Sequence, residues 1–254
     1  MAGTLYLVAG PIGNLEDITL RALRVLREVN LVAAEDTRQA AKLLGHYGIS
    51  KPTLSYHSHN WRQVAPQLIA RLRRGESVAL LSDAGLPGIS DPGGELVALA
   101  GREGIRVTVL PGPSALVAAA ALSGFRLEGV SFWGFPPRRP GRRRRFLEAL
   151  LKEGRPFVFY ESPHRIVQTL ADLADLEPGR LVAVARELTK VFEEVLRGCA
   201  QEVAVQVAAG APRGEYTVVV SASRRVRMPG RGDRSRSGTE GRENTSEDEV
   251  VEEE

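Results

Sequence analysis

The stretch that most constrains the fold is Ser82–Gly94, which reads SDAGLPGISDPGG. It follows an apolar run, Ser77–Leu81, that is typical of a buried strand. Its four glycines, two prolines and two aspartates exclude regular helix or strand, because glycine frees φ, proline fixes φ, and aspartate bonds to local backbone. Open α/β proteins bind ligands at shaped loops that follow their strands. The stretch therefore predicts a binding loop rather than an ordinary surface turn.

Strand-like and helix-like segments alternate through the first half of the chain, which predicts a mostly parallel sheet covered by helices. The predicted strands are Leu5–Ala9, Leu31–Ala34, Val78–Leu81 and Val107–Leu110, and the predicted helices are Ile18–Val29, Arg38–Tyr47, Val64–Arg74 and Glu95–Gly104.

The second half has a different order of segments. Its predicted strands are Ser131–Phe135, Phe157–Tyr160, Leu181–Arg186 and Tyr216–Ser221, and its predicted helices are Ala115–Leu122, Leu147–Lys152, Ile166–Leu173 and Ala200–Ala208. Because Pro111-Gly112-Pro113 interrupts the chain, we predict two α/β domains, residues 1–112 and 113–223, with a ligand cleft between them. Residues 224–254 are polar and nearly free of apolar residues, so we predict a disordered charged tail.

Composition excludes several classes of protein. The single cysteine, Cys199, excludes an intramolecular disulfide and a cysteine-based metal site, and no cluster of metal ligands is evident. No apolar stretch is long enough to span a bilayer and no signal peptide opens the chain, so we expect a cytoplasmic protein without a membrane partner. The net charge of the chain is +3, although acidic residues outnumber arginines after Ser223. The part of the chain before residue 224 is therefore basic, which permits an anionic partner.

Polar motifs follow the first two predicted strands, at the edge of the sheet where Ser82–Gly94 is expected. Gly10–Asn14 (GPIGN) lets a ligand approach the backbone, although it matches neither the dinucleotide fingerprint nor a P-loop. After the second strand, Asp36 could simply cap a helix. Glu35 and Arg38 are not needed for capping, which favours a polar site wall.

Two further polar motifs follow strands of the second half. Phe159–Arg165 (FYESPHR) gathers an aromatic ring, a carboxylate, an imidazole and a guanidinium. A nucleophilic role for Ser162 is disfavoured because no G-x-S-x-G elbow surrounds it. In Ala185–Lys190 (ARELTK), Glu187 and Lys190 could serve in proton transfer or could pair on the surface.

Residues 136–145 read PPRRPGRRRR, which predicts a flexible basic loop beside the cleft, followed by a helix. Arginine suits phosphate recognition, and dense like charge is costly without an anion, so the stretch favours nucleic-acid binding over a solvated loop. The predicted RNA-binding residues are Arg138, Arg139, Arg142, Arg143, Arg144 and Arg145.

Eight motifs occur in order between Gly3 and Ser221: LYLVAGPIGNLEDITLRAL, AAEDTR, LLSDAGLPGISDPG, LPGPSA, GFPPR, FYESPHR, ARELTK and RGEYTVVV. Together they resemble the tetrapyrrole methylase superfamily. The resemblance implies two α/β domains, S-adenosylmethionine as the methyl donor in the cleft between them, and a homodimer. The match is similar to members that 2′-O-methylate a cytidine in the decoding region of small-subunit (16S) ribosomal RNA. This similarity implies that the partner is the 16S ribosomal RNA or the assembled small subunit.

The resemblance also implies positions for the donor, and the proposed reaction requires polar groups near it. The implied donor-binding residues are Ile12, Asp83, Leu86, Ser114, Ala115, Tyr160, Arg186 and Glu215. A 2′-hydroxyl must be aligned with the methyl group and must lose its proton. The candidates for these polar or basic roles are Glu35, Asp36, Arg38, Glu161, His164 and Lys190.

Three alternatives remain open at this stage. A methyltransferase acting on a tetrapyrrole, or one acting on a protein, would use the same donor site. A non-catalytic RNA-binding module would keep the fold without binding the donor. The chain also departs from longer relatives, because a low-complexity tail stands where many of them carry a small helical extension. The arginine stretch would then carry more of the RNA contact, or a partner would help.

Overall fold

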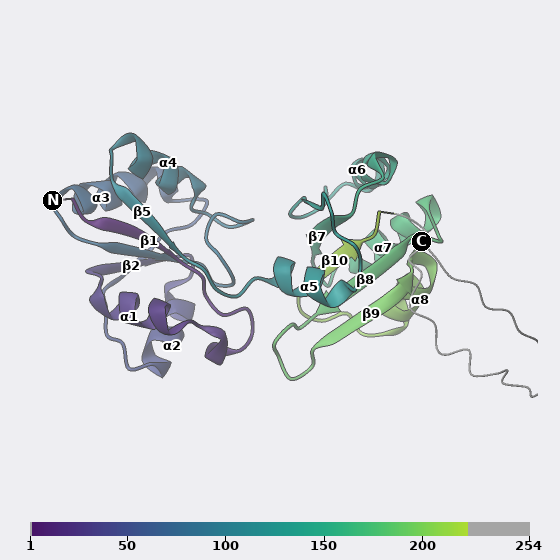
Figure 1. The fold of residues 1–254 in the computed structure, drawn as a ribbon, viewed down its shortest axis with the longest axis horizontal. Coiled ribbons are helices and arrows are strands. Elements are labelled where there is room, and N and C mark those ends of the chain that lie inside the picture. The colour runs from purple at the N-terminus through teal and green to yellow at the C-terminus, as the bar shows by residue number, and fades with distance from the viewer. Residues whose placement is uncertain (1, 223–254) are drawn as a thin grey trace, which may run out of the picture.

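The computed structural model describes residues 2–222, so the predicted charged tail lies outside the described residues. Figure 1 shows two groups of elements, each built around its own sheet and joined by the segment that leads into α5 (Ala115–Ser123). The first sheet has the strand order β3-β2-β4-β1-β5, and the second has the order β6-β7-β10-β8-β9. The predicted α/β fold with two sheets is confirmed.

Every strand pairing in the first sheet is parallel, as the alternation of segments predicts. Its strands are β1 (Thr4–Val8), β2 (Leu31–Ala34), β3 (Thr53–Ser55), β4 (Val78–Leu81) and β5 (Arg106–Leu110). Its helices are the 3-10 turn η1 (Leu15–Asp17), α1 (Leu20–Glu28), α2 (Thr37–His46), α3 (Trp61–Arg73) and α4 (Gly94–Arg102). The predicted start of the first helix at Ile18 is two residues early, because the Thr19 side chain caps the helix by accepting from the Ala22 amide.

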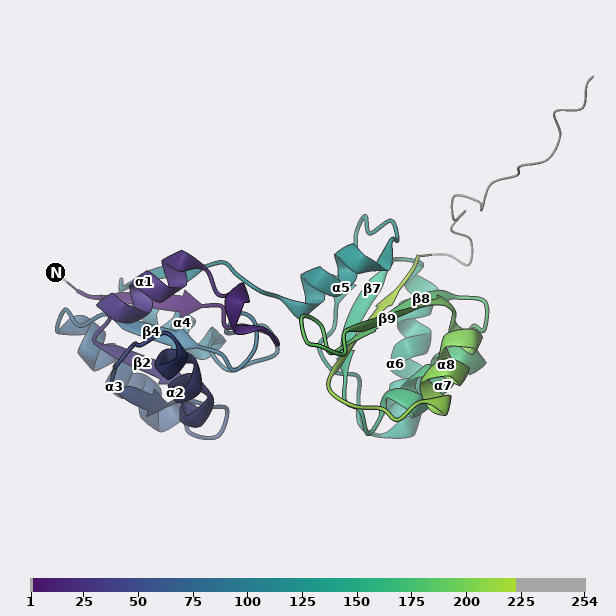
Figure 2. The ribbon, with the colours of Figure 1, turned by 90° about the horizontal axis from the view of Figure 1, so that it is seen from below.

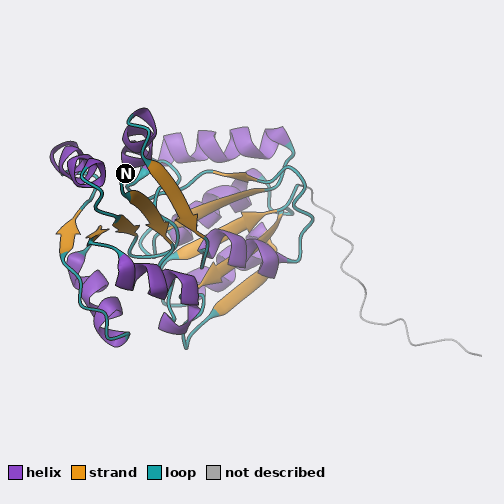
Figure 3. Ribbon diagram, turned by 60° about the vertical axis from the view of Figure 1, so that its left-hand side comes forward, coloured by secondary structure: helices purple, strands orange, loops and turns teal. Residues whose placement is uncertain are grey.

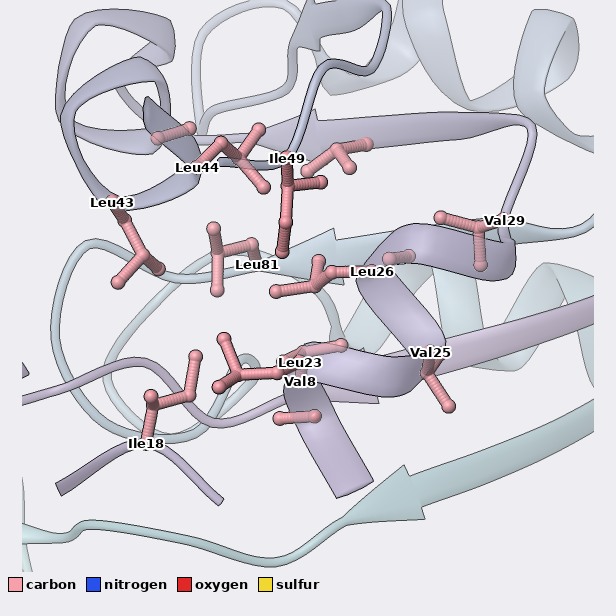
Figure 4. Close-up of a cluster of buried hydrophobic side chains, with 14 of the residues drawn as sticks. Val8, Ile18, Leu23, Val25, Leu26, Val29, Leu43, Leu44, Ile49 and Leu81 are labelled. Carbon is pink, nitrogen blue, oxygen red and sulfur yellow. The ribbon is translucent and has the colours of Figure 1, made fainter. Parts of the chain in front are cut away.

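Helices cover both faces of the first sheet, because successive strand residues point to opposite sides. Val78 and Leu80 of β4 pack with α3 and α4, whereas Ala79 and Leu81 pack with α1 and α2. Figure 4 shows the second of these clusters, where Leu81 lies among side chains of α1 and α2. A parallel sheet covered in this way leaves the loops at its carboxyl edge as the natural ligand site.

The second sheet is mixed. Its strands are β6 (Ser131–Phe132), β7 (Phe157–Glu161), β8 (Leu181–Arg186), β9 (Glu194–Cys199) and β10 (Tyr216–Val220). β6 and β7 are parallel, and the remaining pairs are antiparallel. One face is covered by α6 (Pro140–Glu153), α7 (Ile166–Leu176) and α8 (Ala200–Ala209), and α5 covers the other (Figures 2 and 3).

The prediction of a flexible loop over residues 136–145 is wrong for residues 140–145, because α6 begins at Pro140. Proline is well suited to the first helical position, and arginine is a good helix former. The four consecutive arginines of this stretch therefore lie on a helix, where only some of them can face solvent.

The segment between the two sheets is short. β5 ends at Leu110, Gly112 approaches Ala9, and α5 then packs against β8 and β10 of the second sheet. On these grounds we keep a domain boundary near residue 112 as a proposal. Within residues 2–222, none of the helices combines the length and the apolar character needed to cross a membrane.

Candidate functional site

A cavity of about 600 Å³ lies between the two halves of the chain. The first half contributes loops that follow β1, β2, β4 and β5, and the second contributes the first turn of α5, the end of β7 and the start of β10. This volume falls in the range of sites for small molecules and cofactors. The cavity lies at the carboxyl edge of the first sheet, where the sequence predicts a binding loop.

The cavity wall contains seven of the eight residues that the resemblance implies for donor binding, and their roles remain predictions. These seven are Ile12, Asp83, Leu86, Ser114, Ala115, Tyr160 and Glu215. Ile12, Asp83, Leu86 and Ser114 lie in segments that follow strands of the first sheet. Ala115 is the first residue of α5, and Tyr160 and Glu215 come later in the chain. The distance in sequence between Ile12 and Glu215 shows that the cavity needs both halves.

Arg186 lies elsewhere, so the expectation that it borders the cavity is wrong. Alternate residues of β8 face α5, and Arg186 shares the opposite side with Val182 and Val184. Its Nε donates to Glu194 Oε2 over 2.6 Å. This pair lines a second hollow of about 360 Å³ beside α8.

Two glycines let the backbones of two loops meet at the floor of the cavity. The Gly10 amide donates to the Gly85 carbonyl over 2.9 Å, and the Gly85 amide returns a bond of 3.1 Å. Gly85 has a φ of +73°, which favours glycine. A Cβ at Gly10 would lie only 2.7 Å from the carbonyl oxygen of Ser82. The close approach of these loops leaves a wall of backbone and small residues that a ligand can contact.

Side-chain hydrogen bonds fix the shape of the Ser82–Gly94 loop. The Ser82 hydroxyl donates to the Asp91 carboxylate, nine residues further along. Asp83 Oδ1 accepts from the Asp36 amide over 3.1 Å, which ties the loop after β4 to the loop after β2. Ser90 adopts a left-handed φ of 63°, a conformation that is costly for a residue with a side chain.

Three carboxylates give this part of the cavity a negative character. Burial is the main cause that raises the pKa of Glu35, and repulsion from Asp91 and Asp83 adds to it. Burial also raises the pKa of Asp83 and of Asp91, and each is further raised by a neighbouring carboxylate. A cationic ligand would relieve this repulsion, so the arrangement suits a positively charged group.

Asp36 and Arg38 lie beside the cavity but do not line it. Asp36 caps α2 by accepting from the Arg38 amide over 2.8 Å, and its carboxylate also pairs with the Arg38 guanidinium over 2.6 Å. These hydrogen bonds from Arg38 lower the pKa of Asp36 to about 2. The capping alternative therefore accounts for Asp36, and Arg38 is its exposed partner.

Glu161 is fully buried on the side of β7 that faces α7, so it cannot reach the cavity. Its carboxylate accepts from Arg165 Nε over 2.8 Å, from the Thr169 hydroxyl over 2.7 Å and from the Ser162 amide over 2.8 Å. Arg165 also donates to the Pro136 carbonyl over 3.2 Å. Glu161 therefore connects β7, α7 and the chain that follows β6, and the structure contradicts its expected polar role in the cavity.

The last two candidate residues are exposed outside the cavity. His164 lies in the turn before α7. Lys190 pairs with Glu187, with 2.9 Å between Nζ and Oε1. The loop that carries this pair packs closely on the first half of the chain, because a Cβ at Gly13 would lie 2.6 Å from Lys190 Cγ. Its Leu188 lines the cavity, so the loop helps to join the two halves.

The six predicted RNA-binding arginines divide into paired and unpaired side chains. Arg143 is buried, and its Nε donates to Asp172 Oδ2 over 2.7 Å, so it is unavailable to RNA. Arg144 is exposed but lies 3.4 Å from Asp175, and Arg145 bonds to a carbonyl of its own helix. The remaining three are Arg138, Arg139 and Arg142. Within the described part of the chain, their side chains make no hydrogen bond or ion pair.

Sequence reasoning missed several residues of the cavity wall, among them Asp91 and Phe135. Asp91 could have been found as the second carboxylate of the Ser82–Gly94 stretch. Phe135 stands in the GFPPR motif, but its position at the cavity depends on how the second half folds against the first.

The Glu161 network predicts a large effect on stability. We expect Glu161→Ala to lower the free energy of unfolding by about 3 kcal/mol, because it leaves the partly buried Arg165 guanidinium and the buried Thr169 hydroxyl without their carboxylate partner. The exposed neighbour change His164→Ala is the control, with an expected change within about 0.5 kcal/mol. Chemical denaturation of both variants measures the difference. Equal stability of the two variants would contradict the structural role of Glu161.

Comparison with known proteins gives the chain its family. The family model described as Tetrapyrrole (Corrin/Porphyrin) Methylases matches residues 4–204. A protein of Halalkalibacterium halodurans is 48% identical over 218 residues, which cover 86% of this chain and 75% of that protein. A protein of Thermotoga maritima is 48% identical over 219 residues, covering 86% of this chain and 98% of that protein. Both are named Ribosomal RNA small subunit methyltransferase I.

A solved structure has the same fold at low sequence identity. The uroporphyrin-III C-methyltransferase of Thermus thermophilus, complexed with S-adenosyl homocysteine, superposes with a TM-score of 0.59 at 22% identity. The superposition covers 87% of this chain and 98% of that chain. Family model, relatives and fold agree over nearly all of the described residues, and the chain therefore belongs to the tetrapyrrole (corrin/porphyrin) methylase family.

Proposed function

We propose that this protein transfers a methyl group from S-adenosylmethionine to the 2′-oxygen of a cytidine in the decoding region of 16S ribosomal RNA. The observation that carries the proposal is the cavity, whose wall holds seven of the eight positions implied for the donor. The names of the relatives that are 48% identical support a small-subunit RNA as the acceptor.

The residues of the cavity fit the proposed donor. S-adenosylmethionine carries a positive sulfur and a positive amino group, and it supplies a methyl group already activated by the sulfonium charge. Glu35, Asp83 and Asp91 provide negative charge. Because these carboxylates are partly buried, their attraction for a cation is stronger than it would be in water. Gly85 lines the cavity and carries no side chain, so a ligand can approach the backbone there.

We assign the proton-accepting role to Glu35. It is the member of the six-residue candidate set that lines the cavity, and its raised pKa brings it closer to the operating pH than an ordinary carboxylate. Asp83 and Asp91 would hold the positive groups of the donor, and Tyr160 would pack against its apolar parts.

The acceptor would approach along the exposed arginines of the second half. Phe135 lies in the cavity wall, and the chain runs directly from it through Arg138 and Arg139 into α6. An RNA backbone bound to these arginines would place a nucleotide near the cavity.

The first experiment follows labelled methyl transfer from S-adenosylmethionine to purified small ribosomal subunits and to free 16S RNA, with the product nucleoside identified by mass spectrometry. We expect 2′-O-methylcytidine from the wild type. Asp83→Ala should reduce its formation at least tenfold, because the change removes a cavity carboxylate and the bond to the Asp36 amide. Asp175→Ala, an exposed carboxylate on α7, is the matched control and should retain activity.

Three outcomes would contradict the proposal, the last two of which also need a measurement of donor binding. Transfer to a different nucleoside would refute the cytidine assignment. Donor binding without transfer to either form of RNA would favour a tetrapyrrole or protein acceptor. Absence of donor binding as well would favour the non-catalytic RNA-binding alternative.

The proton-accepting role of Glu35 predicts a pH dependence. A base must be ionised to act, so the rate of transfer should rise with pH through the pKa of Glu35 and then level off. Because this pKa is raised from its ordinary value of 4.5, the rise should lie above pH 4.5. Glu35→Gln should abolish this rise and lower the maximal rate about a hundredfold. Values of kcat/KM for the donor, which report the pKa of the protein before the donor binds, test this when measured across the pH range, and an unchanged profile in Glu35→Gln would exclude the role.

We also propose a homodimer and a cytoplasmic location. Helix α5 reads ALVAAAALS and is apolar on all sides, yet its Leu122 is exposed, as are Val191 and Phe192 in the loop between β8 and β9. A second copy would cover these side chains. Light scattering by the full chain should give the mass of two chains, and the mass of one chain would contradict the dimer. The cytoplasmic location follows from the proposed ribosomal substrate.

A further inference from the structure

Two large aromatic residues next to the cavity remain half exposed. Trp133 is 45% exposed and Phe135 is 47% exposed, although both lie beside a well-packed sheet. They follow β6, which is one of the two edge strands of the second sheet, and are separated by Gly134. Neighbouring exposed aromatic rings of this kind mark surfaces that a partner covers.

The two rings lie on opposite faces of the second sheet, and each is held in place by an aromatic neighbour. The Trp133 ring meets the Phe146 ring of α6 edge-on, with centroids 5.8 Å apart. The Phe135 ring meets the Tyr160 ring with centroids 5.7 Å apart. Trp133 Nε1 also donates to the Ser131 hydroxyl over 2.9 Å. A ring that is fixed before binding loses little conformational entropy when a ligand stacks on it.

The segment that carries these rings borders the cavity and reaches the first half of the chain. Phe135 lines the cavity wall together with Ser90. Gly134 has a φ of +57°, and a Cβ on it would lie 3.2 Å from Ser90 Oγ. On its other side, the carbonyl of Pro136 accepts from Arg165, which is fixed by the buried Glu161. The buried network thus positions the aromatic segment at the entrance.

Positive charge continues directly from the aromatic residues. Arg138, Arg139 and Arg142 are exposed, and within residues 2–222 their side chains make no hydrogen bond or ion pair. Aromatic rings beside a basic track are the combination that binds single-stranded nucleic acid, because bases stack on the rings while phosphates contact the cations.

We propose that Trp133 and Phe135, on the two sides of the segment that follows β6, each stack on an unpaired RNA base and together form a stacking surface around this edge of the sheet, with Arg138, Arg139 and Arg142 on the adjoining phosphates. The inference rests on the proposed function and deepens it, because it names the form of RNA that the site accepts. Bases within an A-form duplex are stacked on one another and present no free face to a protein ring. The surface therefore selects nucleotides that are already unpaired and brings them to the cavity.

The first test uses the intrinsic fluorescence of Trp133. The chain has two tryptophans, so Trp61→Phe leaves Trp133 as the reporter. A short single-stranded RNA should quench this fluorescence as it binds, and the same RNA annealed to its complement should quench it weakly. Equal quenching by single strand and duplex, or no quenching by either while binding is seen by anisotropy, would overturn the proposal.

The second test separates stacking from apolar packing. Trp133→Leu and Phe135→Leu should each weaken binding of a labelled single-stranded RNA about tenfold, which is the loss expected for one stacked base. The conservative changes Trp133→Phe and Phe135→Tyr should stay within about threefold of the wild type. Val205→Ala, at an exposed apolar residue on α8, is the matched control and should not alter binding. Far-ultraviolet circular dichroism confirms that each variant is folded.

The assay of methyl transfer distinguishes failure of this inference from failure of the proposed function. If wild type and both leucine variants methylate subunits with the same KM for RNA, the stacking surface is wrong and the reaction stands. If the wild type binds no RNA and methylates neither RNA nor subunits, both proposals fail. The stacking surface itself predicts a KM for RNA raised about tenfold in Trp133→Leu, with the rate at saturating RNA retained.

Discussion

The site depends on the close approach of two backbones at Gly10 and Gly85. Their reciprocal hydrogen bonds join the loops after β1 and β4, which are neighbouring parallel strands that end at the same edge of the sheet. A side chain at Gly10 would collide with Ser82, so the contact requires glycine. Asp83 then connects this floor to the loop after β2 through the Asp36 amide. The first half thereby presents one rigid, negatively charged wall to the second half.

The alternation of side chains along the second sheet decides which residues reach this wall. On β7, Tyr160 points to the side of α5 and the cavity, whereas its neighbour Glu161 points into the core beneath α7. On β8, Arg186 lies on the same face of the strand as Val182 and Val184, which is the face toward α8. Adjacent polar residues in one sequence motif therefore have different tasks, since one contacts the cavity and the next holds the structure that surrounds it.

Much of the first half could be predicted from sequence, because apolar runs and glycine-rich loops act locally. The parallel sheet and the loop at Ser82–Gly94 follow from such patterns. The strand β9 was missed because it is a half-exposed edge strand without a continuous apolar run. The role of Arg143 could not be predicted, since its partner Asp172 lies 29 residues further along the chain. The partners of Glu161 are close in sequence, but that Glu161 points into the core depends on which face of β7 it occupies. Strand alternation could have excluded Arg186, had the register of β8 been known.

The central claim is that the cavity between the two halves binds the methyl donor. A crystal structure of the protein with S-adenosylhomocysteine tests this most directly. The account predicts that the molecule lies between the Ser82–Gly94 loop and the residues Tyr160 and Glu215, in contact with both halves. Binding in the hollow beside Arg186 and Glu194, or binding that touches one half alone, would contradict it.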